Sequence, residues 1–195
     1  MKKIILASAS PRRKELLEQI GLDFQVMVCG GEEPIETTIP EEAVKEHALQ
    51  KLKAVVSHLE ETDNTKDVIV LSADTVVAYG DKILEKPKDE QDARDMLALL
   101  QGNTHQVYTG VALYDYLSKE KKLFAQKTEV SFFAMTEEEI AEYVNTKEPM
   151  DKAGSYGIQG IGGKFVREIK GDYNNVVGLP VARIYQEIKW MMNND

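Results

Sequence analysis

The segment that most constrains the fold is VIVLSADTVV, residues 68–77. A nearly continuous run of β-branched residues is typical of a strand buried on both faces, and such strands lie at the centre of α/β sheets. Asp74 contradicts this apolar setting, because burying an unpaired carboxylate costs several kcal/mol. In an extended strand Asp74 and Ser72 share one face, whereas Thr75 lies on the other. The sequence therefore predicts a central strand that ends in a compensated carboxylate.

Two roles are open for Asp74. A carboxylate at the carboxyl end of a central strand is well placed to bind a metal ion, or to act as a base that activates water. The alternative is a structural aspartate that caps a neighbouring loop.

The rest of the chain supplies strands and helices in mixed order. Gly80 followed by Asp81 predicts a hairpin turn, and adjoining strands of this kind favour an α/β fold with a mixed central sheet flanked by helices. With 195 residues and no internal repeat, the chain is expected to form a single domain, 1–195. The expected strands are 3–7, 24–28, 68–77, 106–114, 123–133 and 164–169. The expected helices are 11–20, 41–59, 89–102, 136–144 and 180–192.

A pair of arginines in the segment LASASPRR is the second misfit. Ser10 as N-cap predicts that a helix begins here, which places Arg12 and Arg13 in its first turn. The positive end of the helix disfavours each arginine by roughly 0.3–1 kcal/mol unless an anion is bound. With the hydroxyls of Ser8 and Ser10, the two guanidiniums would form a phosphate cradle. The alternative is that both arginines are solvated at the surface.

Composition limits the partners. The net charge of −9 disfavours an extended polyanion such as DNA, although a few cations gathered locally could still bind a small anion. No apolar run is long enough to cross a bilayer, so no membrane partner is expected. The amino terminus lacks the pattern of a signal peptide, and Cys29 is the only cysteine. Both features favour a cytoplasmic location.

Other charged residues are weaker candidates when taken singly. Glu32 and Glu33 are of the type that binds Mg²⁺, although acidic pairs in loops are usually only solvated. Lys51 lies beside the apolar stripe of the predicted helix 41–59, and Lys86 follows a strand; for both, an ordinary surface lysine is the alternative. Two lysines and two arginines at one site would suit a triphosphate.

Two patterns are set aside. The glycine-rich segment YGIQGIGGKF is not a Walker loop, because Ile158 and Phe165 stand where that motif needs glycine and serine or threonine. The histidines have no zinc-type spacing, and His105 is expected to be structural.

Eight segments occur in order along nearly the whole chain: LASASPRRKELL, GGEEP, ALQKLKA, VLSADTVV, LEKP, GNTHQVYTGV, EPMDKAGSYGIQG and GDYNNVVGLP. In this combination they resemble the Maf family of nucleoside triphosphate pyrophosphatases. The resemblance implies an elongated two-lobed α/β fold with a cleft, similar to inosine triphosphate pyrophosphatases, and commonly a homodimer. It also implies hydrolysis between the α and β phosphates of a nucleoside triphosphate, with help from Mg²⁺ or Mn²⁺.

The resemblance also assigns roles by position. Asp74 matches the proposed proton acceptor, and Glu33 matches the acidic loop residue. We expect these two carboxylates to hold the divalent metal ion. Arg13, Lys51 and Lys86 match cations that contact the phosphates.

Three further positions separate branches of the family. Arg12, Thr75 and Gln159 resemble the dTTP/UTP branch, whereas the branch acting on 7-methylguanosine triphosphate typically has Trp, Gln and Glu there. The amide of Gln159 both donates and accepts, which matches the O4 and N3–H edge of uracil or thymine. Two alternatives stay open: a pyrophosphatase for modified purine triphosphates such as 7-methyl-GTP, and a non-catalytic, nucleotide-sensing regulator of septum formation.

Overall fold

A computed structural model describes residues 2–30, 34–62 and 67–193. The strands are β1 (Lys3–Leu6), β2 (Phe24–Val26), β3 (Val68–Tyr79), β4 (Lys82–Leu84), β5 (Thr104–Asp115), β6 (Lys121–Phe132) and β7 (Val166–Lys170). The helices are α1 (Pro11–Gln19), α2 (Pro40–Glu61), α3 (Glu90–Leu100), α4 (Glu137–Asn145), α5 (Tyr173–Val177) and α6 (Val181–Asn193). Short 3-10 helices are η1 (Glu148–Asp151), η2 (Ala153–Ser155) and η3 (Ile161–Phe165).

The strands form a seven-stranded sheet in the order β2-β1-β3-β5-β6-β7, with β4 paired to β3. Strand β1 is parallel to β2 and β3, whereas the β3–β4 and β6–β7 pairs are antiparallel. The predicted α/β fold with a mixed central sheet is therefore confirmed. The prediction of a helix over 41–59 is confirmed by α2, while α5 was not expected.

The chain divides into two compact units. The first contains the described residues of 1–74, 109–126 and 178–195, and the second contains 75–108 and 127–177. The chain first passes from one unit to the other between Asp74 and Thr75, within β3. The expectation of a single domain stays a prediction.

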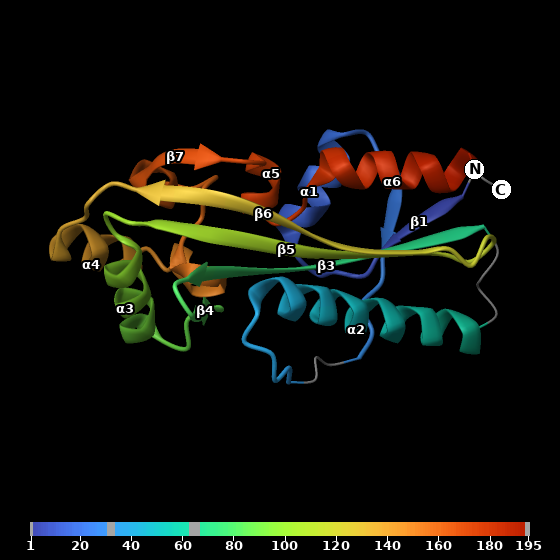
Figure 1. The fold of residues 1–195 in the computed structure, drawn as a ribbon, viewed down its shortest axis with the longest axis horizontal. Coiled ribbons are helices and arrows are strands. Elements are labelled where there is room, and N and C mark those ends of the chain that lie inside the picture. The colour runs from blue at the N-terminus through green and yellow to red at the C-terminus, as the bar shows by residue number, and fades with distance from the viewer. Residues whose placement is uncertain (1, 31–33, 63–66, 194–195) are drawn as a thin grey trace. The chain divides into compact units, whose positions relative to one another are not determined.

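The first unit is built around the amino-terminal half of β3. Residues 68–73 of this strand are all buried, as its β-branched composition requires. Figure 1 shows α2 on one face of the strands of this unit, and α1 and α6 on the other. Val68 and Val70 pack with Ala48 and Leu52 of α2. The face of β3 that carries Ser72 and Asp74 is therefore the face toward α2.

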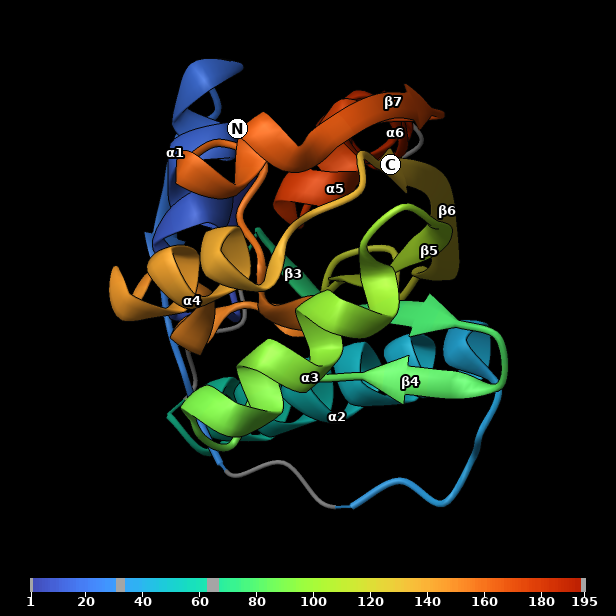
Figure 2. The same ribbon diagram turned by 90° about the vertical axis from the view of Figure 1, so that its left-hand side faces the viewer.

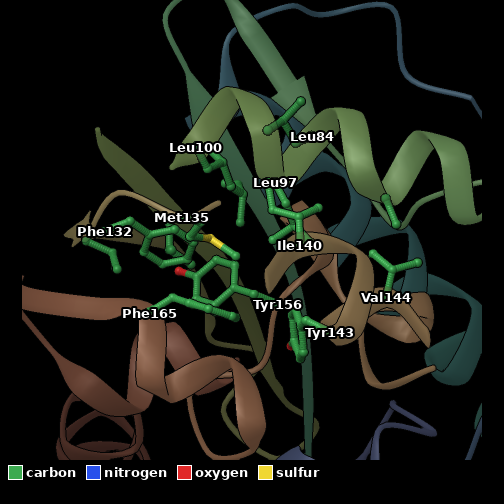
Figure 3. Packing of buried hydrophobic residues seen from close by; sticks show 14 residues of the cluster. Leu84, Leu97, Leu100, Phe132, Met135, Ile140, Tyr143, Val144, Tyr156 and Phe165 are labelled. Atoms are coloured by element: carbon green, nitrogen blue, oxygen red, sulfur yellow. The ribbon is translucent and has the colours of Figure 1, made fainter. Parts of the chain in front are cut away.

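The second unit holds its own hydrophobic core. Helix α3 packs against α4 (Figure 2), and both contribute to a buried cluster that includes Phe132, Tyr143 and Tyr156 (Figure 3). The helix starts follow local rules: Asp89 caps α3, and Thr136 begins α4 with a full capping box. Within the described ranges, no helix is both long and apolar enough to span a bilayer.

Candidate active site

Asp74 is paired with two side chains of α2. Its Oδ1 accepts a hydrogen bond from Lys51 Nζ at 2.6 Å, and its Oδ2 lies 3.2 Å from His47 Nδ1. His47 and Lys51 are four residues apart, so they project from the same side of the helix. Helix α2 therefore supplies the partners that a carboxylate in a buried strand requires.

The surroundings of Asp74 keep it ionised. Burial alone would raise its pKa, but the hydrogen bond with His47 and the charges of Lys51 and Arg13 outweigh burial and lower the pKa to about 2. The carboxylate is thus an anion throughout the neutral range. A carboxylate with so low a pKa is a weak base. It becomes a stronger base when a second anion binds the neighbouring cations and weakens their effect on its pKa.

Two contacts fix α2 against the sheet at the level of Asp74. Ser72 donates from Oγ to the carbonyl oxygen of Ala48 at 2.6 Å. Gly110 of β5 lies so close to α2 that a Cβ built on it would stand 2.1 Å from the carbonyl oxygen of Val44. Backbone contacts of this kind set the height and rotation of the helix, and hence the positions of His47 and Lys51.

Arg13 lies inside the first unit and is only 8% exposed. Its Nε donates to the carbonyl oxygen of Gly178 at 2.9 Å, and its Nη1 donates to Ser8 Oγ at 3.1 Å. The alternative of a solvated surface arginine is therefore wrong for Arg13. Its charge acts on Asp74. Asp74 lies in the interior of β3, which continues to Tyr79, so the prediction that the central strand ends in this carboxylate is wrong.

The serines behave differently from a simple cap. Ser10 occupies the N-cap position of α1, as predicted, but its side chain makes no capping hydrogen bond. Instead, the backbone N–H of Ser10 donates to the buried Ser8 Oγ at 3.3 Å. Arg12 follows in the first turn of α1 and is partly buried.

The other predicted residues belong to the second unit. Lys86 and Gln159 are exposed, and Thr75 is partly buried. The segments that carry them are joined: the N–H of Gly154 donates to the carbonyl oxygen of Glu85 at 3.1 Å, and Gly154 packs against Val77 of β3. The roles of Thr75, Lys86 and Gln159 stay predictions.

Metal binding depends on carboxylates. Glu32 and Glu33 lie outside the described residues, and among those that are described no three His, Cys, Asp or Glu side chains form a metal-binding group. Mg²⁺ commonly binds through one or two carboxylates together with substrate phosphates and water. The hard, ionised oxygens of Asp74 fit that kind of site.

His47 is the site residue that the sequence patterns missed. Its only signal was its spacing of four residues from Lys51 on a helix that faces Asp74. The expectation for His105 is confirmed, since it is buried with Nε2 2.9 Å from the hydroxyl oxygen of Tyr156. Burial lowers the pKa of His105 to about 4, so this histidine is neutral in the core.

Acid titration tests the environment of Asp74. Because its pKa is lowered in the folded state, Asp74 adds stability above its ordinary pKa, and this contribution disappears as the pH falls through about 2. We compare the unfolding free energies of wild type and Asp74→Asn at two pH values. When the pH is lowered from 6 to 3, the wild type should lose roughly 1 kcal/mol more than the variant. Urea unfolding at both pH values measures it, and a difference that does not change with pH would contradict the ion pairing.

Taken together, the fold and this cluster define a class: α/β proteins whose central strand carries a carboxylate surrounded by cations. This arrangement is suited to an anionic ligand. Comparison with known proteins is more specific. Residues 3–191 match the family described as Maf-like protein, and the chain belongs to this family.

Three curated relatives cover almost the whole chain. A dTTP/UTP pyrophosphatase of Bacillus cytotoxicus is 56% identical over 191 residues, which are 97% of this chain and 95% of the relative. A dTTP/UTP pyrophosphatase of Bacillus cereus (strain G9842) is 54% identical with the same coverage. One from Agathobacter rectalis is 52% identical over 97% of both chains.

Proposed function

We propose that this protein is a nucleoside triphosphate pyrophosphatase that hydrolyses the α–β phosphate bond of dTTP and UTP to the nucleoside monophosphate and pyrophosphate. The observation that carries this proposal is the half-buried cluster of Asp74 with Lys51, His47 and Arg13. Relatives more than 50% identical and named dTTP/UTP pyrophosphatase support the choice of substrate.

Asp74 would orient the attacking water and accept its proton, for in-line attack on the α-phosphorus. Its pKa of about 2 in the free protein depends on the charges of Lys51 and Arg13. A bound triphosphate would share those charges, which raises the pKa of Asp74 and makes it a better base. The substrate itself would thus activate the carboxylate.

Lys51 and Arg13 would stabilise the negative charge that develops on the pyrophosphate leaving group. Ser8 and Ser10 would add hydroxyl donors at the turn before α1. From the family resemblance, Lys86 would serve as a further phosphate cation, and Arg12, Thr75 and Gln159 would set the choice of base.

A divalent cation, Mg²⁺ or Mn²⁺, completes the proposal, with Asp74 and Glu33 as its protein ligands. It would supply charge neutralisation at the phosphates and a bound water of lowered pKa. The same resemblance supports a homodimer, and the single cysteine is in keeping with a cytoplasmic location.

A substrate panel tests the function. The panel compares dTTP, UTP, CTP, 7-methyl-GTP and ITP in the presence of Mg²⁺, with product identification. Preferred release of dTMP and UMP with pyrophosphate is the expected result. Preference for 7-methyl-GTP or ITP would support a purine pyrophosphatase instead, and binding of dTTP without pyrophosphate release would support a nucleotide sensor.

Lys51 and Lys53 form a matched pair on α2. Lys51 contacts Asp74, whereas Lys53 is exposed. We expect Lys51→Met to lower kcat/KM for dTTP about 30-fold, since one charge-assisted contact to phosphate is lost. Lys53→Met should change kcat/KM less than about twofold. Equal losses in both variants would show that only the overall charge matters.

A further inference from the structure

The carboxylate of Glu148 accepts hydrogen bonds from three donors in the second unit. Its Oε1 accepts from Tyr143 Oη at 2.8 Å and from the N–H of Gly162 at 3.0 Å, and its Oε2 accepts from the N–H of Ile161 at 2.9 Å. Tyr143 Oη in turn accepts from the N–H of Gly157 at 3.1 Å. Glu148 and Tyr143, together called the clamp below, therefore hold both ends of the segment 157–162.

The glycines of this segment fit the clamp closely. A Cβ on Gly160 would stand 2.5 Å from Glu148 Oε2, and one on Gly162 would stand 2.5 Å from Tyr143 Oη. Both positions are therefore closed to any larger residue without displacement of the clamp. The backbone N–H groups that a Walker loop would offer to phosphate are here bound to a carboxylate of the chain itself.

The clamp has a rigid base. Tyr143 is only 1% exposed and lies in the core cluster of Figure 3, with its ring centroid 5.4 Å from that of Phe165. Burial would raise the pKa of Glu148, but the N–H groups of Gly162 and Ile161 and the hydroxyl of Tyr143 lower it, so the carboxylate stays ionised.

Gln159 lies in the middle of the clamped segment and is exposed. Its side-chain amide both donates and accepts, and it can rotate about its own bonds. The place from which this amide reaches a base is set by the backbone of the segment. Contact between Gln159 and a base therefore depends on how firmly residues 157–162 are held.

We propose that Glu148 and Tyr143 are positioning residues for binding of the pyrimidine base, because they hold the segment that carries Gln159. The proposal rests on the proposed function, and it assigns the clamp no part in the phosphate chemistry. Asp74, Lys51 and Arg13 belong to the other unit of the chain. Loss of the clamp should therefore raise KM for dTTP and leave kcat nearly unchanged.

The test uses Glu148→Gln, which replaces one acceptor oxygen by an NH₂ group that faces an N–H donor or the hydroxyl. We expect KM for dTTP to rise about tenfold, because one donor of the clamp loses its acceptor and residues 157–162 are held less firmly. The value of kcat should stay within about threefold of wild type. Tyr143→Phe, which keeps the ring in the core, should raise KM in the same direction.

Glu142→Gln is the matched control, since Glu142 is exposed on α4, the helix of Tyr143, and the same charge is lost. It should leave KM unchanged. An unchanged KM in both Glu148→Gln and Tyr143→Phe, or a loss confined to kcat, would overturn the clamp while leaving the proposed function intact. A wild-type protein that does not hydrolyse dTTP would overturn the proposed function.

Discussion

Replacing Asp74 with asparagine is expected to lower kcat for dTTP by about two orders of magnitude or more. Asparagine has nearly the same shape and can still accept a hydrogen bond from Lys51, but it carries no negative charge and cannot take a proton from water. In the absence of a divalent cation, binding of dTTP should persist or become tighter, because a negative charge near the phosphates is removed. Steady-state kinetics and calorimetric titration of dTTP measure the two effects separately.

Asp95→Asn is a suitable control, because Asp95 is an exposed aspartate on α3 and the charge change is the same. It should keep the kcat of wild type. If Asp74→Asn turned over dTTP within threefold of wild type, Asp74 would have no part in the reaction. If it lost binding as well as turnover, the aspartate would act mainly on the structure around Lys51 and His47.

Replacing Gly110 with alanine is expected to destabilise the protein by roughly 3 kcal/mol or more. The added Cβ would stand 2.1 Å from the carbonyl oxygen of Val44 and 2.7 Å from the backbone N of Lys45. No side-chain rotation can relieve a clash with backbone, so α2 must move away from β5. That shift would also separate Lys51 from Asp74, and kcat should fall in the protein that remains folded. Urea unfolding measures the loss of stability.

Gly21→Ala serves as the comparison. Gly21 has φ of +70°, and a Cβ built there would meet no atom within 4 Å. Only the cost of a left-handed residue applies, roughly 1 kcal/mol. Equal losses in Gly110→Ala and Gly21→Ala would show that α2 can move from the sheet at little cost.

Much of the fold was predictable because short-range rules agree with one another. The β-branched run before Asp74 became the buried part of β3, and Thr136 with Glu139 formed the capping box that begins α4. Asp89 caps α3 as expected. In each case the signal lies within a few residues, and the tertiary contacts reinforce it.

The site was only partly predictable. Asp74 and Lys51 were identified as misfits in apolar surroundings, and the structure pairs them. His47 was overlooked, because a histidine on a helix has no distinguishing pattern of its own. Glu148 was overlooked for the same reason, although the glycines that pack against it were conspicuous.

By itself, then, the sequence determined most of the helices and strands and the mixed class of the sheet. It also identified the residues that do not suit their local surroundings. Only the tertiary structure decided their partners: Arg13 donates to the carbonyl oxygen of Gly178, which is 165 residues away, and Asp74 meets Lys51 from 23 residues away. The physical reason is the distance along the chain over which each kind of information acts. Helix and strand periodicity is encoded between near neighbours, whereas a hydrogen bond between distant residues leaves no local pattern and exists only after the core has packed.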